Sequence, residues 1–283
     1  MGKKVKKATE SNENFYESST SLTTDTPAET ENSDSSKKDI VKGFTAHQVG
    51  KRIDAKKSIA RYVVKNIIKD GMSIFLDAGS SVREVGLHLF DKSNLSGLTI
   101  MTNNMLIFNE FTTRSKEMTE LGNVLALTGG VYNQNHEALF GQTAEQVLKT
   151  FNPVVVIIGA SGFMVEEIND PQYPQQGAFH HDLVSEVVTK KAIATTRTKC
   201  RVIVCDFSKI GSWDASCFST IQELAEKTEL CKIVTSIIPD SLEKSKRNYY
   251  ENKYSETKEQ LKKSSVSDKV ELIRVDINGI PVD

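Results

Sequence analysis

The stretch Ser73-Ile-Phe-Leu-Asp77-Ala-Gly-Ser-Ser81 decides the fold of this chain. It opens with a short apolar run, typical of a strand buried on both faces, and a helical pattern begins at Val82. Gly79, Ser80 and Ser81 stand between the two, where backbone N–H groups and hydroxyls meet the positive end of a helix dipole. Such a strand–turn–helix unit is typical of a parallel α/β sheet. Its turn either binds an anion or serves only as a tight turn with a serine cap.

The same alternation of strand and helix continues along the chain. Further predicted strands are 98–102, 123–128, 153–159, 201–206, 217–220, 231–236 and 270–276. The predicted helices are 54–70, 82–90, 104–115, 141–150 and 182–196. Because most of these strands are apolar along their length, helices are expected to cover both faces. The pattern predicts an α/β fold with a parallel, Rossmann-like sheet.

Composition narrows the class of protein further. The 283 residues include 36 Lys+Arg and 37 Asp+Glu, a net charge of −1, which gives no bulk electrostatic footprint for nucleic acid. None of the 4 cysteines forms a C-x-x-C pair, which predicts reduced, buried thiols and a cytoplasmic location. No apolar run reaches the length of a membrane span, and no apolar core of a secretory signal follows the N-terminal lysines. We expect no metal, no cofactor and no membrane contact.

Four parts of the chain differ in composition. Residues 1–44 form a Ser/Thr-rich polar tail that is expected to be disordered. Residues 45–240 carry the α/β pattern, and 270–283 hold a terminal strand that completes it. Between them, 241–269 is a charged stretch expected to be a solvated helix or an insertion. The basic cluster Lys3, Lys4, Lys6 and Lys7 either touches nucleic acid or an acidic partner or is simply solvated.

Small and polar residues follow five of the predicted strands. Because ligands of parallel sheets bind outside the carboxyl ends of the strands, these turns are expected to line one crevice. Hydroxyls, amides, an Asp and a Lys there suit a small polar anion. The five turns are Asp77–Ser81, Thr102–Asn104, Thr128–Gly130, Gly159–Gly162 and Cys205–Lys209.

From about Lys56 to Pro239, a series of motifs resembles the C-terminal effector-sensing domain of the DeoR family of bacterial transcriptional regulators. The resemblance implies a fold shared with ribose-5-phosphate isomerase, glucosamine-6-phosphate deaminase and CoA transferases, a phosphorylated sugar or similar metabolite as ligand, and a homo-oligomer. The motifs are, in order, Lys56-Lys-Ser-Ile-Ala60 with Asp70-Gly71, Phe75-Leu-Asp-Ala-Gly-Ser-Ser81, Leu98-Thr-Ile-Met-Thr-Asn103, Leu127-Thr-Gly-Gly130 with Gly141, Ile158-Gly-Ala-Ser-Gly-Phe163, Gly177 with Glu186, and Asp206-Phe-Ser-Lys209.

Twelve residues are expected to bind the ligand on these grounds. Gly79, Ser80 and Ser81 would hold a phosphate, Lys209 would supply a positive charge, and Glu186 would meet a ligand hydroxyl. The alternatives are a bracing role for Asp77, a helix cap for Asn103, and solvated side chains at Lys209 and Glu186. No catalytic residue is expected, and the adjacent His180 and His181 lack the spacing of a metal site. The full set is Asp77, Gly79, Ser80, Ser81, Thr102, Asn103, Gly129, Gly130, Gly159, Ser161, Glu186 and Lys209.

The sequence departs from the family in three places, one of which is Ser80-Ser81, where threonines are usual in the family. Full-length members carry a winged helix-turn-helix before the sensor, whereas the polar tail shows no recognition-helix pattern, so direct DNA contact is not expected. The segment Val165–Gln176 is inserted after the fourth turn.

Three functions follow from the sequence: a non-enzymatic sensor, a sugar-phosphate isomerase or deaminase on the same fold, and a repressor that binds DNA through its tail. Stretches typical of ribose-5-phosphate isomerase, D-G-A-D-E and K-G-G-G, are not found.

Overall fold

The computed structural model describes residues 52–165, 168–170, 173–175, 178–181, 186–212 and 216–282. All of them fall within one compact unit, Ile40–Asp283. The predicted tail 1–44, the motif residue Gly177 and the start of the predicted helix 182–196 lie outside the described residues.

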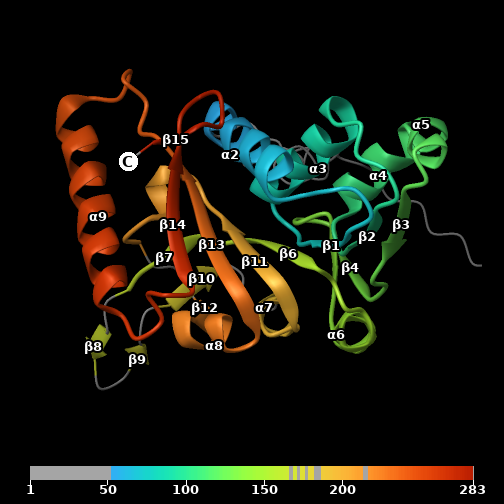
Figure 1. Ribbon diagram of the computed structural model, residues 1–283. Helices are drawn as coiled ribbons and strands as arrows, with labels where there is room; N and C mark the ends of the chain where they lie inside the picture. The colour runs from blue at the N-terminus through green and yellow to red at the C-terminus, as the bar shows by residue number, and fades with distance from the viewer. Residues whose placement is uncertain are drawn as a thin grey trace, which may run out of the picture. The chain divides into compact units, whose positions relative to one another are not determined.

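An eight-stranded sheet forms the centre of the fold, in the order β15-β14-β13-β11-β6-β1-β2-β3 (Figure 1). Seven of its strands run parallel, which confirms the predicted sheet. The last strand, β15, pairs antiparallel with β14 and closes that edge. The strands are β1 Ser73–Leu76, β2 Thr99–Thr102, β3 Val124–Leu127, β6 Val155–Gly159, β11 Thr198–Val204, β13 Thr228–Ser236, β14 Val270–Val275 and β15 Pro281–Val282.

Helices cover both faces of this sheet because its strands are apolar on both sides. Ile74 and Leu76 point into one core and Phe75 points into the other, as the two-residue repeat of a strand requires. The first core packs under α2 Ile53–Asn66, α3 Ser80–Lys92, α4 Met105–Thr113 and α5 Ser115–Glu120. The second packs under α6 Gln142–Thr150, α7 Val187–Ala194, α8 Ile221–Glu226 and α9 Lys244–Lys263.

Four of the five predicted helices end at other residues in the structure, since 82–90 extends to Lys92 and 182–196 ends at Ala194. The predicted helix 54–70 ends at Asn66, and the predicted helix 104–115 ends at Thr113, with α5 following after Arg114. Among the described helices, none is both long and apolar enough to cross a bilayer.

The charged stretch 241–269 contains a helix with a buried face. Tyr254, Thr257 and Leu261 of α9 are buried, and the Arg274 guanidinium of β14 lies 4.3 Å from the centre of the Tyr254 ring. The helix lies beside β14, at the edge of the sheet opposite β3 (Figure 1). The helix is therefore packed onto the second core through one face, and its other faces are exposed.

Small antiparallel sheets follow the ends of several main strands. The predicted strand at 217–220 is β12 Ser216–Thr220, and it pairs with β10 Ala178–His181 outside the main sheet. The strand β7 Gly162–Phe163 completes that group, and β8 Ile168–Asp170 and β9 Tyr173–Gln175 form a hairpin inside the inserted segment. Another hairpin, β4 Val131–Asn133 and β5 Ala138–Phe140, contacts the end of β2 through the Leu139 N–H, which donates to Asn103 O at 2.8 Å.

Candidate functional site

The turn after β1 presents the N-terminus of α3 at the carboxyl edge of the sheet. Gly79 is the N-cap residue with φ 117°, a conformation that only glycine adopts readily, and no side chain caps the helix there. No acidic residue lies in the first turn of α3. The first amides of a helix have no partner within it. The geometry of Gly79, Ser80 and Ser81 is therefore suited to an anion, and their contact with a ligand stays a prediction.

Asp77 lies directly beneath this turn and is fully buried. Its Oδ2 accepts a hydrogen bond from the Lys190 ammonium of α7 and one from the Gly159 N–H at 3.3 Å. Lys190 also donates to Gly159 O at 2.8 Å. Burial raises the pKa of the Asp77 carboxyl, and the charge of Lys190 acts against that rise. The pair joins the turns after β1 and β6 to helix α7.

The end of β2 is held by side-chain hydrogen bonds to its neighbours. Thr102 Oγ1 donates to Leu76 O at 2.6 Å and accepts from the Asn104 N–H at 3.0 Å. Asn104, and not the predicted Asn103, is the N-cap of α4. Asn103 is buried, its amide nitrogen donates to Leu139 O at 3.3 Å, and its Oδ1 has no hydrogen-bond donor among the described residues. That buried acceptor is available to a ligand.

The glycine pair after β3 lets the β4–β5 hairpin approach closely. A Cβ at Gly130, whose φ is 119°, would lie 2.5 Å from Phe140 O of β5. The tip of the hairpin carries His136, whose Nδ1 lies 3.7 Å from Glu186 Oε2. Glu186 is buried and is the N-cap residue of α7, one turn before Lys190. The hairpin thus spans from the end of β2 to the start of α7.

Charged side chains of both signs lie close together beside the turn after β11. Lys209 ends the short helix η2 Phe207–Lys209, whose Asp206 cap lies 3.6 Å from Arg52 Nε. Lys56 of α2 is buried, and burial lowers its pKa to about 8. The charges of Asp206, Glu84, Lys209 and Arg52 all act on that pKa, so these groups lie close together. Glu84 is in α3, which places the cluster beside the first turns of that helix.

The structure therefore brings most of the predicted residues to one edge. Contacts link Asp77 to Lys190 and Gly159, Asn103 to the β5 strand, and the β4–β5 hairpin to Glu186. Gly129 lies in the turn that leads into the hairpin, and Ser161 is half-buried in the turn between β6 and β7.

Lys56, His136 and Lys190 belong to this group and were not predicted from the sequence. A lysine or histidine in a polar stretch gives no signal of burial. Only the helical spacing of Lys190, four residues after Glu186, could have placed those two side chains on one face. No group of three or more His, Cys, Asp or Glu side chains suited to a metal occurs in the described part of the chain.

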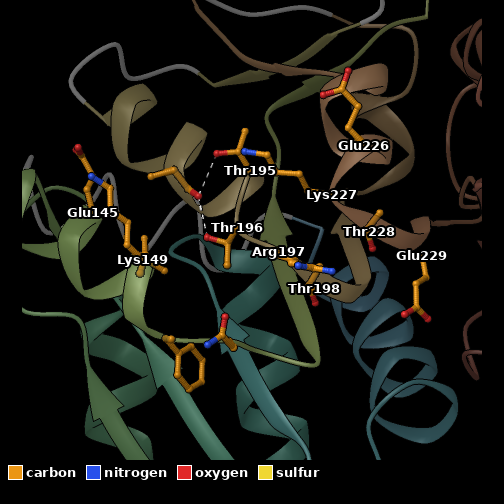
Figure 2. Close-up of a pocket in the computed structure, with 14 residues that line it drawn as sticks. Glu145, Lys149, Thr195, Thr196, Arg197, Thr198, Glu226, Lys227, Thr228 and Glu229 are labelled. Atoms are coloured by element: carbon orange, nitrogen blue, oxygen red, sulfur yellow. Dashed lines mark hydrogen bonds between the residues drawn. The ribbon is translucent and has the colours of Figure 1, made fainter.

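A groove of about 760 Å³ lies at the opposite, amino-terminal edge of the sheet (Figure 2). It is bordered by the last residues of α6, α7 and α8 and by the first residues of β11 and β13. Its charges balance, with Lys149, Arg197 and Lys227 against Glu145, Glu226 and Glu229. Since helix C-termini disfavour anions, this groove is poorly suited to an anion.

The comparison with protein families identifies the domain that contains this edge of the sheet. The model of the DeoR C-terminal sensor domain matches residues 51–231, well over half of the chain. The chain belongs to the DeoR family through this sensor domain.

Two curated relatives are transcriptional regulators. The chain is 26% identical over 146 residues to the uncharacterized HTH-type transcriptional regulator YgbI of Escherichia coli, covering 52% of this chain and 49% of that one. It is 24% identical over 173 residues to the HTH-type transcriptional regulator GlpR of Haloferax volcanii, and the match covers 61% of this chain and 59% of that one. The chain thus spans about half of the length of these relatives.

Among solved structures, a ribose 5-phosphate isomerase A from Methanocaldococcus jannaschii is similar over 54% of this chain and 52% of that one, with 17% identity and a TM-score of 0.33.

Proposed function

We propose that this chain is the effector-sensing part of a DeoR-type regulator and binds a phosphorylated sugar or a similar small phosphate ester at the carboxyl edge of its sheet. The ligand would shift the protein between conformations and would not be turned over. We further propose that the protein works in the cytoplasm as a homo-oligomer.

The observation that carries this proposal is the arrangement of charge around the start of α3. Uncapped amides of the first turn lie on one side, and Lys56, Lys209 and Arg52 lie close to one another beside α3. Helix N-termini and lysine ammonium groups are the usual partners of a phosphate. The buried acceptors of Asn103 and Glu186 lie farther along the same edge, where the rest of a phosphorylated sugar would extend.

Thermal unfolding with matched pairs of compounds tests the proposal. The pairs are glucose 6-phosphate with glucose, ribose 5-phosphate with ribose, and glycerol 3-phosphate with glycerol. At 100 times its Kd, a ligand adds about 2.7 kcal/mol of stability, enough to raise Tm by roughly 5–11 °C for a domain of this size. At least one phosphate ester should raise Tm while its unphosphorylated partner does not. Equal effects within every pair would contradict the proposal.

A matched pair of variants locates the site. Ser81→Asp places a carboxylate in the first turn of α3, where it suits the helix dipole but repels a phosphate. The control, Ser115→Asp, makes the same change in the exposed first turn of α5. We expect the first variant to fold and lose the phosphate-dependent rise in Tm, and the control to keep it.

Assays of turnover separate the sensor from the isomerase or deaminase that shares its fold class. We expect no aldose–ketose interconversion of ribose 5-phosphate or glucose 6-phosphate and no ammonia release from glucosamine 6-phosphate. Turnover that Glu186→Gln abolishes would replace the sensor with an enzyme, because a buried carboxylate is a suitable general base.

A further inference from the structure

The turn that carries Lys209 is short and needs support from its surroundings. Its helix η2 has only three residues, Phe207–Lys209, and a helix of this length is marginal in isolation. Within the turn, the Lys209 N–H donates to Asp206 O at 2.9 Å. The Ser208 N–H donates to Asp206 Oδ1 at 3.1 Å. Because these bonds are all local, the position of the Lys209 side chain depends on what packs against the turn.

The first half of helix α9 packs against this turn. The ring of Tyr250 meets the ring of Phe207 edge to face, with 5.1 Å between the ring centres, and Phe207 is 6% exposed. One turn further along α9, the side chain of Lys253 covers Gly211, where a Cβ would lie 2.8 Å from Lys253 Cδ. Helix α9 lies beyond residues 51–231, so the match to the sensor domain does not include these contacts.

The start of α2 contacts the same turn. Arg52 Nε lies 3.6 Å from Asp206 Oδ1, and the Arg52 guanidinium lies 5.6 Å from the centre of the Phe207 ring. The charges of Arg52 and Lys209 both lower the pKa of Lys56, which places the turn beside that residue. Phe207 therefore joins the charged side chains near α3 to helix α9.

We propose that α9 positions Lys209 for the ligand, with Tyr250 as the positioning residue: its ring holds Phe207, and Phe207 fixes the turn that presents the Lys209 ammonium. This inference rests on the proposed function. Without the Tyr250 ring, the turn samples more conformations, and only a fraction of them places Lys209 within reach of a phosphate. The apparent affinity falls by that fraction. Because the ring acts through packing, phenylalanine should replace it.

Amide hydrogen exchange of the full chain without ligand tests the first step. Tyr250→Ala should speed exchange at the Lys209 and Gly211 amides about tenfold, because the turn opens locally more often. Tyr250→Phe should leave both rates unchanged. Leu224→Ala is the control for stability, because Leu224 is fully buried in the second core on α8, which packs on β12 and β13. It should not speed exchange at either amide.

Isothermal titration with ribose 5-phosphate, glucose 6-phosphate and glycerol 3-phosphate tests the second step. For each ester that binds the unmodified protein, Tyr250→Ala should raise Kd about tenfold, as expected when a charge-assisted hydrogen bond is lost. Tyr250→Phe and Leu224→Ala should leave Kd within about twofold of the unmodified protein.

A double-mutant cycle shows whether Tyr250 acts through Lys209. Lys209→Met removes the ammonium and should also raise Kd about tenfold. When Tyr250→Ala is added to Lys209→Met, the ester should bind no more weakly than to Lys209→Met alone, since no ammonium is left to position. A change at Tyr250 that merely loosened the fold would add its own loss in both backgrounds.

Unchanged exchange in Tyr250→Ala, an unchanged Kd, or additive losses in the cycle would each overturn the inference and leave the proposed function standing. Binding of none of the three esters to the unmodified protein would overturn the proposed function and the inference with it. If Tyr250→Ala does not fold, Lys253→Ala takes its place in all three measurements with the same expected results, because it removes the side chain that covers Gly211.

Discussion

The Lys190 ammonium donates a hydrogen bond to Asp77 Oδ2, and both side chains are fully buried at the carboxyl edge of the sheet. The two residues are 113 positions apart in the chain. Through Gly159, which bonds to both side chains, the pair joins the ends of β1 and β6 to helix α7. It therefore fixes the distance between the predicted phosphate turn and the helix that starts at Glu186.

Breaking this pair from the lysine side should be costly. Lys190→Met leaves Asp77 as a buried charge without its counter-ion, and the free energy of unfolding should fall by about 3–5 kcal/mol. Urea denaturation measures the loss. Lys191→Met is the control, because Lys191 is exposed, and its ion pair with Glu223 should contribute less than about 1 kcal/mol. Equal stability of the two variants would show that the buried pair contributes nothing specific.

Lys56 gives the protein a stability that depends on pH. Burial lowers the pKa of its ammonium from 10.5 to about 8 in the folded protein. Between these values the unfolded chain binds the extra proton, so this contribution to the free energy of unfolding rises with pH. The lysine thus destabilises the fold below about pH 8, and the penalty is relieved as the pH rises through that value. The relief should amount to about 1–3 kcal/mol.

The comparison of Lys56→Met with the unmodified protein at pH 7.5 and pH 9.5 checks this prediction by urea unfolding. The free energy of unfolding of the unmodified protein should rise relative to that of Lys56→Met at the higher pH. Lys57→Met, at the exposed neighbouring position, should change the free energy of unfolding equally at both pH values. A difference independent of pH for Lys56→Met would contradict the lowered pKa.

Two glycines of the site should respond differently to alanine. Gly130→Ala brings a Cβ to 2.5 Å from Phe140 O at a φ of 119° and should cost about 2–3 kcal/mol. A Cβ at Gly159 would lie 3.4 Å from Ala78 O, an ordinary contact, so Gly159→Ala should cost less than about 1 kcal/mol. Thermal unfolding of both variants measures the difference, and a larger loss for Gly159→Ala would refute this description of the two turns.

Helix α9 should contribute to the stability of the whole unit. Leu261 is 4% exposed within the second core, so Leu261→Ala should lower the free energy of unfolding by about 2–5 kcal/mol. Tyr249 on the same helix is 57% exposed, and Tyr249→Ala should change it by about 0.5 kcal/mol. Similar small effects of both changes would mean that α9 is a solvated insertion after all.

The sequence predicted the main sheet well because its strands are continuous apolar runs. The predicted strand began at Arg201, whereas β11 begins at Thr198. Hydropathy does not indicate that the polar residues before Arg201 pair with a neighbouring strand. It also missed that Arg201 itself is fully buried, where its guanidinium donates to the carbonyls of Leu224 and Thr196. Burial lowers the pKa of this arginine to about 10.

Sequence reasoning predicted the candidate residues that follow strands or start helices, and it missed two lysines inside helices and the histidine of the β4–β5 hairpin. Asp77, Thr102 and Gly159 were predicted as site residues because they lie at the ends of β1, β2 and β6. The carboxyl ends of parallel strands lie at the same edge of the sheet. Lys56 and Lys190 lie on helices, where a lysine usually marks a solvated face. Their burial depends on partners far away in the chain, and no local pattern shows such contacts.

A crystal structure of the protein with the sugar phosphate that raises its Tm most tests the central claim directly. The account predicts the phosphate at the N-terminus of α3, against the amides of Ser80 and Ser81 and within reach of Lys56 or Lys209. A phosphate in the groove at the opposite edge, among Lys149, Arg197 and Lys227, would contradict it.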